Sequence, residues 1–453
     1  MNTKALRQKI LDLAIHGKLV PQDPNDEPAS VLLERIKAEK ERLIKEGKIK
    51  RTKRSKAACD KPHYPYELPK GWCFCCINDI AESLLGKTLD KSKDKGVPKE
   101  YLCAINVQWG RFDFSILKSF LIGENEFQRY SVKQGDLMVC EGGDVGRCAI
   151  WEENEREMYY QNALHRIRCE YGISNYFLQY ALWYYKLNGT IDYLCKGVTI
   201  KHFTQTTMSK LAIPLPPSNE QKRIVDEIQR LFSIIDKVEE RKDKLQLTIR
   251  QTKSKILDLA IHGKLVPQDP TDEPATELLK RINPKAEITC DNPHYRNNLP
   301  KGWAVCRLED IVEYEQPTAY IVSSTDYDDS YPTPVLTAGK SFLIGHTNDD
   351  EGIFSNLPCI IFDDFTTDSK LVNFPFKVKS SAMKILKVHK NLNIEYVASF
   401  MSITRLIGDT HKRYWISEYS KLEIPLPPYK EQVRIKNQIK LLFERLDSIT
   451  ECL

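Results

Sequence analysis

Residues 219–262 read NEQKRIVDEIQRLFSIIDKVEERKDKLQLTIRQTKSKILDLAIH, and the organisation of the whole chain follows from them. Apolar residues recur at steps of three and four along this segment, which predicts one helix with a single apolar stripe. The stripe comprises Ile224, Ile228, Leu231, Phe232, Ile235, Val238, Leu245, Ile249, Ile256 and Leu259. Roughly 40 residues at 1.5 Å rise would make a rod about 60 Å long, and such a rod needs a partner to cover its stripe.

The two ends of the chain repeat the two halves of this segment. Near the C-terminus, EQVRIKNQIKLLFERLDSI repeats the first half, with Ile435, Ile439, Leu442, Phe443 and Leu446 at matching positions. Near the N-terminus, KILDLAIHGKLVPQDP (9–24) is identical to residues 255–270. We therefore expect an intramolecular antiparallel pairing of both ends with the central helix. A helical bundle or an oligomerising coiled coil is the alternative.

This pairing predicts a set of residues that pack one helix against another. They are Ile224, Ile228, Phe232, Ile235, Ile435, Ile439 and Phe443.

Length and composition indicate a multi-domain protein of ordinary globular type. The 453 residues suffice for two or three domains, and 41% hydrophobic with 28% charged residues is typical of soluble proteins. A net charge of +5 permits a nucleic-acid partner without requiring one. Neither a secretory signal nor a membrane span is recognisable, so we expect a cytoplasmic protein.

Two globular domains are marked by repeated landmarks at their ends. HYPYELPKGW (63–72) returns as HYRNNLPKGW (294–303), and IPLPP occurs at 213–217 and 424–428. Short strands with turn chemistry, such as EGGDVGR (141–147), alternate with few helices, and we expect one of these helices at about 174–187. The predicted fold is α+β, with two globular domains separated by long antiparallel helices in a quasi-circular, pseudo-twofold arrangement. The predicted ranges are an N-terminal helical segment at 1–61, globular domains at 62–218 and 291–429, a central helical spacer at 219–290 and a C-terminal helix at 430–453.

The motifs that could indicate catalysis fail on their context. AESLLGKT (81–88) fits a loose phosphate-loop pattern, but the residues after it lack the helical period that such a loop requires. Glycines 142, 143 and 146 lie between two expected strands, and not between a strand and a helix as in dinucleotide-binding folds. Cys73, Cys75 and Cys76 have no second pair at zinc spacing. We expect neither a catalytic site nor a metal site.

Basic and aromatic residues recur at matching places in the two domains. GVTIKHF (197–203) aligns without gaps to GDTHKRY (408–414), and this combination suits contact with DNA phosphates and base edges. A loop that packs its aromatic residue and leaves its lysine solvated is the alternative. NALHRIR (162–168) and FPFKVKSSAMKI (374–385) predict further strands that carry basic residues. The basic run at 48–56 fits either a solvated linker or a phosphate contact.

With these features the chain resembles the specificity subunit of type I restriction–modification systems. The resemblance rests on the paired LPKGW segments, the GKT loop at 86–88, EGGDVGR, the two IPLPP segments with EQ-x-RI after them, and the duplicated KILDLAIHGKLVPQDP. The second domain departs from the pattern, because it lacks a clear GKT counterpart and carries an acidic TDYDDSY segment (325–331).

The resemblance implies a non-catalytic subunit in which each globular domain reads one half of a split DNA target. Because the two domains differ, we expect an asymmetric target. The implied partners are double-stranded DNA, two methyltransferase subunits that use S-adenosylmethionine, and restriction or translocase subunits that use ATP and Mg²⁺. The chain itself is expected to bind no cofactor. A non-enzymatic helical scaffold that joins two protein-binding modules is the alternative.

The predicted DNA-contacting residues come from the basic loops and strands of both domains. They are Lys87, Thr88, Lys91, Lys93, Arg147, His165, Arg166, Thr199, Lys201, His202, Lys377, Lys379, Thr410, His411, Lys412, Arg413 and Tyr414.

Overall fold

The computed structural model describes residues 2–47, 67–90, 92, 94–169, 172–195, 202–288, 299–337, 342–406 and 412–452. It divides into two compact units, unit 1 (Met1–Glu240) and unit 2 (Arg241–Leu453). The division falls inside helix α8 (Ser218–Ile261), whose bounds lie within one residue of the predicted helix. Each half of α8 therefore belongs to the unit against which it packs.

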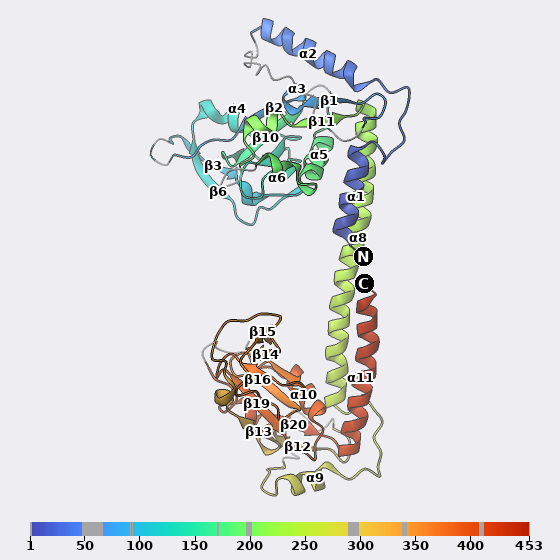
Figure 1. Cartoon of the computed structure of the whole chain (residues 1–453), viewed down its shortest axis with the longest axis vertical. Helices are drawn as coiled ribbons and strands as arrows, with labels where there is room; N and C mark the ends of the chain where they lie inside the picture. The colour runs from blue at the N-terminus through green and yellow to red at the C-terminus, as the bar shows by residue number, and fades with distance from the viewer. Residues whose placement is uncertain are drawn as a thin grey trace. The chain divides into compact units, whose positions relative to one another are not determined.

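In unit 1 the first half of α8 pairs with α1 (Thr3–Ile15) in antiparallel orientation (Figure 1). Arg7 of α1 donates to Asp236 at 2.6 Å and to Glu239 at 2.9 Å, and Figure 1 shows that α1 runs from there toward the start of α8. The apolar stripe is covered by this contact because the side chains of both helices join one hydrophobic core. The buried residues of the pair are Ile10, Leu11, Ala14, Ile15, Ile224, Val225, Ile228, Phe232 and Ile235.

In unit 2 the second half of α8 pairs with α11 (Tyr429–Glu451), again in antiparallel orientation (Figure 1). Lys253 donates to Asp447 at 2.5 Å, and its ammonium group lies 4.9 Å from the centre of the Phe443 ring. Ile435 and Ile439 are buried in the same core as Ile256 and Leu257. All the predicted packing residues except the half-buried Phe443 are thus buried.

The stripe of α8 is not covered along its whole length. Val238 and Leu245, which the sequence pattern assigns to the stripe, are each 38% exposed. The periodicity is correct, but α1 begins only at Thr3 and α11 ends at Glu451, so both partner helices are shorter than the helix that they cover.

The globular part of unit 1 is built on a four-stranded antiparallel sheet in the order β2-β10-β7-β8. The predicted turn at EGGDVGR connects β7 to β8, and the predicted helix appears as α5 with Ser174 as its N-cap. A second sheet has the order β6-β3-β9. The strands are β2 (Ala81–Leu85), β3 (Val97–Leu102), β4 (Val107–Gln108), β5 (Arg111–Phe112), β6 (Lys118–Ile122), β7 (Leu137–Cys140), β8 (Cys148–Ile150), β9 (Tyr159–Tyr160) and β10 (Leu164–Cys169). The helices are α2 (Ala29–Lys45), α3 (Ile77–Ile80), α4 (Phe127–Tyr130), α5 (Asn175–Leu187), α6 (Thr190–Leu194) and α7 (Gln205–Ser209).

Unit 2 repeats this arrangement with a sheet in the order β13-β19-β16-β17 and a smaller one in the order β15-β14-β18. The predicted strand at 374–385 is in fact two strands, β18 and β19, because the chain turns between them at residues 379–382. The strands are β13 (Val312–Glu315), β14 (Thr333–Leu336), β15 (Leu343–Thr347), β16 (Cys359–Asp363), β17 (Ser369–Val372), β18 (Lys377–Val378) and β19 (Met383–Val388). The helices are α9 (Ala275–Ile282) and α10 (Ile394–Ile403).

Each globular part is closed by pairing its first strand with its last. β1 (Cys73–Cys76) pairs with β11 (Ala212–Leu215), and β12 (Ala304–Arg307) pairs with β20 (Glu423–Leu426). The repeated LPKGW and IPLPP segments thus flank one two-stranded sheet in each unit.

A buried junction next to this sheet fastens each globular part to its helix. In unit 1 the Trp72 indole donates to Glu220 at 3.0 Å, and Gln22 donates to the other oxygen of Glu220 at 3.2 Å. In unit 2 the Trp303 indole donates to Glu431 at 3.2 Å, and Gln268 donates at 3.1 Å. Burial raises the pKa of both glutamates, while the hydrogen bonds from glutamine and tryptophan lower it.

Across the described ranges, no helix combines the length and the apolar character needed to cross a membrane.

Candidate nucleic-acid interface

Four segments of unit 1 meet at one end of the sheet β2-β10-β7-β8. The Glu141 N–H donates to the Ala163 carbonyl at 2.9 Å, and the Phe203 N–H donates to the Glu141 carbonyl at 2.8 Å. At the neighbouring strand, the Gly86 N–H donates to the Leu164 carbonyl at 3.1 Å. We define rim 1 as the segments 86–88, 141–143, 161–163 and 202–203, which these bonds bring together.

Unit 2 forms an equivalent end of its sheet, with counterparts of two of these backbone bonds. The Asp364 N–H donates to the Ala382 carbonyl at 3.0 Å, and the Tyr414 N–H donates to the Asp364 carbonyl at 2.9 Å. The strands beneath are also in equivalent register, since Leu164 pairs with Cys140 and Met383 with Asp363. We define rim 2 as the segments 316–318, 364–366, 380–382 and 412–414.

A different polar group lies buried beneath each rim. In unit 1 this is His165, fully buried, with Nε2 at 2.9 Å from the Phe203 carbonyl oxygen. Burial lowers the pKa of His165 to about 4, so the ring is neutral at physiological pH.

In unit 2 the equivalent position is Lys384, which donates to Gln316 at 3.0 Å and lies 3.5 Å from Asp364. Burial lowers the pKa of Lys384, and the carboxylate of Asp364 opposes that effect. Asp364 also accepts a hydrogen bond from the Trp415 N–H at 2.7 Å. This buried pair was not predicted, because the sequence does not show that residues 20 positions apart share one interior site.

The predicted loop lysine Lys87 is buried and ion-paired. Only 8% of the residue is exposed, and its ammonium nitrogen lies 3.0 Å from Asp94 and 2.9 Å from Glu126. Burial lowers the pKa of Lys87, but the hydrogen bonds to these two carboxylates outweigh it and raise the pKa overall. The sequence predicts a DNA contact at Lys87, whereas the structure places its ammonium group in ion pairs within unit 1.

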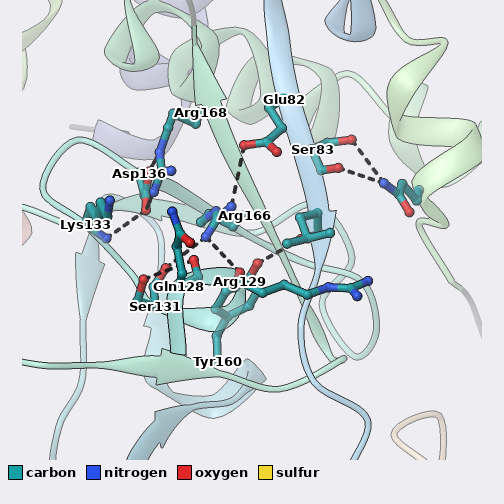
Figure 2. A network of polar contacts seen from close by, with 12 residues as sticks. Glu82, Ser83, Gln128, Arg129, Ser131, Lys133, Asp136, Tyr160, Arg166 and Arg168 are labelled. Carbon is teal, nitrogen blue, oxygen red and sulfur yellow. Dashed lines mark hydrogen bonds and ion pairs between the residues drawn. The ribbon is translucent and has the colours of Figure 1, made fainter. Parts of the chain in front are cut away.

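Arg166 is similarly enclosed (Figure 2). Its guanidinium donates to the carbonyl oxygens of Arg129 at 3.1 Å and Ser131 at 2.9 Å, and it lies 3.6 Å from Glu82. The neighbouring Arg168 makes a bidentate pair with Asp136, with both contacts at 2.7 Å. Arg166 and Arg168 of β10 therefore form hydrogen bonds and ion pairs with other segments of unit 1.

Two further predicted contacts also bond within their own unit. Arg147 donates to the Ala104 carbonyl at 2.8 Å. Lys377 is 2% exposed, lies 3.1 Å from Asp349 and also donates to the Glu351 carbonyl. Tyr414 is buried in the core of unit 2, which agrees with the alternative in which the aromatic residue of this loop packs inward.

The remaining predicted residues that the structure describes are exposed. They are Thr88, His202, Lys379, Lys412 and Arg413. Lys412 pairs with Glu418, and the Arg413 guanidinium lies 6.0 Å from the centre of the Phe365 ring. Lys91, Lys93, Thr199, Lys201, Thr410, His411 and the basic run at 48–56 lie outside the described residues.

The family model for the type I restriction modification DNA specificity domain matches residues 69–247. The EcoAI specificity subunit of Escherichia coli is 26% identical over 92% of this chain and 81% of its own length. The EcoEI specificity subunit of Escherichia coli is 30% identical over 68% of this chain and 62% of its own length. This chain belongs to the type I specificity subunits.

The fold of this chain is also found in a solved structure. A chain solved in work on complex assembly and conformational transition of the type I R-M system aligns with a TM-score of 0.55. The alignment has 16% sequence identity and covers 86% of this chain and 94% of that one. The residues matched by the family model begin at the Pro69–Trp72 segment and run into α8, so they include all of rim 1 and the junction partner Glu220.

Type I specificity subunits are non-catalytic components that recognise DNA targets. For the part of this chain that the structure describes, no group of three or more His, Cys, Asp or Glu side chains is placed to hold a metal ion. Beneath rim 1 the His165 Nε2 lies within hydrogen-bonding distance of a backbone carbonyl, and beneath rim 2 Lys384 pairs with Asp364, which suits a rigid binding surface.

Proposed function

We propose that this specificity subunit reads a split, asymmetric DNA target, with rim 1 on one half and rim 2 on the other. The observation that carries this proposal is the pair of rims themselves. Both are held by equivalent backbone hydrogen bonds, from residue 141 to 163 and 203 to 141 in unit 1, and from 364 to 382 and 414 to 364 in unit 2. Their exposed side chains differ, as two different half-targets require.

The exposed predicted residues are assigned to the DNA surface. In rim 1 these are Thr88 and His202, and in rim 2 they are Lys412 and Arg413, with Lys379 directly before the rim. Cations such as Arg413 suit phosphate contact and guanine edges, whereas hydroxyl and imidazole groups suit base edges. The buried residues Lys87, His165, Arg166 and Lys377 and the half-buried Arg147 are assigned to support of the surface, because they form hydrogen bonds or ion pairs within their own unit.

The helices are proposed to dock two methyltransferase subunits. Apolar side chains on α8 are exposed, with Ile234 at 47% and Leu247 at 51%. S-adenosylmethionine would be bound by those subunits, and ATP and Mg²⁺ by restriction or translocase subunits, with no cofactor on this chain. This work on DNA would take place in the cytoplasm.

A methylome of the source cell, with and without the gene for this chain, tests the proposal. Loss of methylation at one split motif whose two halves differ is the expected result. A palindromic motif, or an unchanged methylome in a cell where the methyltransferase subunit co-purifies with this chain, would overturn it.

A further inference from the structure

The segment Gly86–Lys87 is packed against the turn at residues 161–164 more closely than any side chain at position 86 would permit. A Cβ added at Gly86 would lie 2.2 Å from the carbonyl oxygen of Gln161, well inside van der Waals contact. The Lys87 N–H donates to the Tyr160 carbonyl at 3.1 Å, and the Asn162 N–H donates to the Lys87 carbonyl at 3.0 Å. The glycine is therefore needed for the approach of two backbones, as glycine often is where chains meet closely.

We call the contact of Gly86 and Lys87 with residues 160–162 the clamp. The side chain of Lys87 also bonds within unit 1. Its ammonium group contacts Asp94 at 3.0 Å and Glu126 at 2.9 Å, so two carboxylates already surround one positive charge. A DNA phosphate would meet a site with net negative charge there. Lys87 is thus bound to the protein and is not presented to a polyanion.

The turn that this clamp holds places Asn162 at its tip. The Leu164 N–H donates to the Gln161 carbonyl at 3.0 Å, which makes Asn162 the second residue of a tight turn. The Asn162 side chain is exposed, and among the described residues no partner is found for its amide, although its backbone is bonded to Lys87. A carboxamide on a backbone that is already held can offer one donor and one acceptor to a base, and only the side chain has to be ordered on binding.

We propose that Asn162 reads an adenine in the half-target of unit 1, and that Gly86 and Lys87 hold its turn and do not contact phosphate. The inference rests on the proposed function, because it names a reading residue on rim 1. The carboxamide forms a bidentate pair with N6 and N7 of adenine in the major groove, and this pair distinguishes adenine from other bases. Loss of one such pair corresponds to about a 5- to 150-fold loss of discrimination.

The reading role is tested with the full-length chain and its methyltransferase subunits in a host that lacks other DNA methylation. Wild type, Asn162→Ala and Asn78→Ala are compared by methylome sequencing. Asn78 is an exposed asparagine of unit 1 in helix α3, which precedes β2, whereas rim 1 lies at the other end of that strand. It is therefore a control of the same residue type away from rim 1. Asn162→Ala should relax the motif at one A·T pair in one half, whereas Asn78→Ala should leave the motif unchanged.

Absence of any motif with the wild-type chain would refute the proposed function. A wild-type motif that Asn162→Ala leaves unchanged, or relaxes at a G·C pair, would refute the reading role alone. If Asn162→Ala abolishes methylation entirely, Asn162→Ser decides, because serine is favoured in turns and its single hydroxyl cannot form the bidentate pair. A full wild-type motif with Asn162→Ser overturns the inference, and a relaxed A·T pair upholds it.

The role of Lys87 is tested by the salt dependence of target binding by the assembled complex. Each lysine that neutralises a phosphate contributes about 0.9 to the slope of log affinity against log salt. Lys87→Met should weaken binding while the slope stays that of the wild type. A slope lower by about 1 would show that Lys87 contacts a phosphate, and it would refute the inference that Lys87 only holds the turn.

Discussion

Rim 1 and rim 2 share a backbone framework but differ in the charge that lies beneath it. A neutral histidine, His165, supports rim 1, whereas the ion pair of Lys384 and Asp364 supports rim 2. Each unit also has a buried lysine near its rim, but from a different place in the fold. Lys87 follows β2 in unit 1, and Lys377 begins β18 in unit 2.

This difference separates two kinds of constraint on the same fold. The junctions to the helices are nearly identical, with Trp72–Glu220 and Trp303–Glu431 contacts of 3.0 and 3.2 Å. The interiors beneath the rims have diverged, although the hydrogen bonds that shape the rims are retained. A specificity subunit can therefore change what it reads while the attachment of each reading surface stays constant.

The largest expected effect is on the shared junction. Trp72→Ala and Trp303→Ala should each lower the free energy of unfolding by about 3–5 kcal/mol, since each removes a buried indole and leaves a buried glutamate short of a donor. Urea unfolding of the full-length chain, followed by circular dichroism, measures both losses. Tyr193→Ala, which truncates an aromatic residue that is 68% exposed, is the control and should change stability by less than about 0.5 kcal/mol. Losses that differ by more than about 2 kcal/mol between the two tryptophans would contradict the equivalence of the junctions.

The pH dependence of stability should distinguish the two interiors. The pKa of His165 is about 4 in the folded chain and about 6.5 when unfolded, so the unfolded state binds more protons between these values. Stability therefore falls as the pH decreases from about 6.5 to 4, by about 3 kcal/mol in total.

His165→Gln keeps a donor for the Phe203 carbonyl but does not titrate, so it should lose less stability than wild type in this range. Urea unfolding at pH 7.5 and pH 4.5 measures the difference for both proteins. Equal losses in the two proteins would show that His165 is not the acid-sensitive group.

The two rims should also differ in the salt dependence of DNA binding. Arg413→Ala and Lys412→Ala should each weaken target binding by the assembled complex and reduce the salt slope by about 1, without unfolding unit 2, because both side chains are exposed. His202→Ala in rim 1, which removes a group assigned to a base edge and not to a phosphate, should leave the slope unchanged. Unchanged affinity of both rim 2 variants would remove these residues from the interface.

The smallest expected effect concerns the cations that bridge the helices. Arg7 contacts two carboxylates, and its guanidinium lies 4.9 Å from the centre of the Phe232 ring. Lys253 contacts one carboxylate, and its ammonium group lies 4.9 Å from the centre of the Phe443 ring. Arg7→Ala should cost about 1 kcal/mol and Lys253→Ala about 0.5 kcal/mol in thermal unfolding. Lys9→Ala, which affects only an exposed pair on α1, is the control. A larger cost for Lys253→Ala than for Arg7→Ala would reverse this ranking.

Periodicity predicted the helices well because one face of each is apolar. The bounds of α8 and α5 differ from the predicted bounds by one residue, and the predicted packing residues are buried or half-buried. The same reasoning did less well for the basic strand residues. Alternation shows that Arg166 and Lys377 share a face with particular neighbours, but it does not show whether another segment covers that face.

The sequence by itself determined the repeated order of helices and globular domains, the bounds of α8 and the family, because local periodicity and duplicated segments are visible without folding. The repeated segments LPKGW and EQ-x-RI also contain the tryptophan and the glutamate of each junction, but the sequence does not show that these two residues are in contact. Only the tertiary structure decided which cationic side chains form ion pairs or hydrogen bonds inside each unit. The partners of Lys87, Arg166 and Lys384 come from segments distant in the chain, and burial next to a partner, not residue type, decides whether a charge can reach DNA.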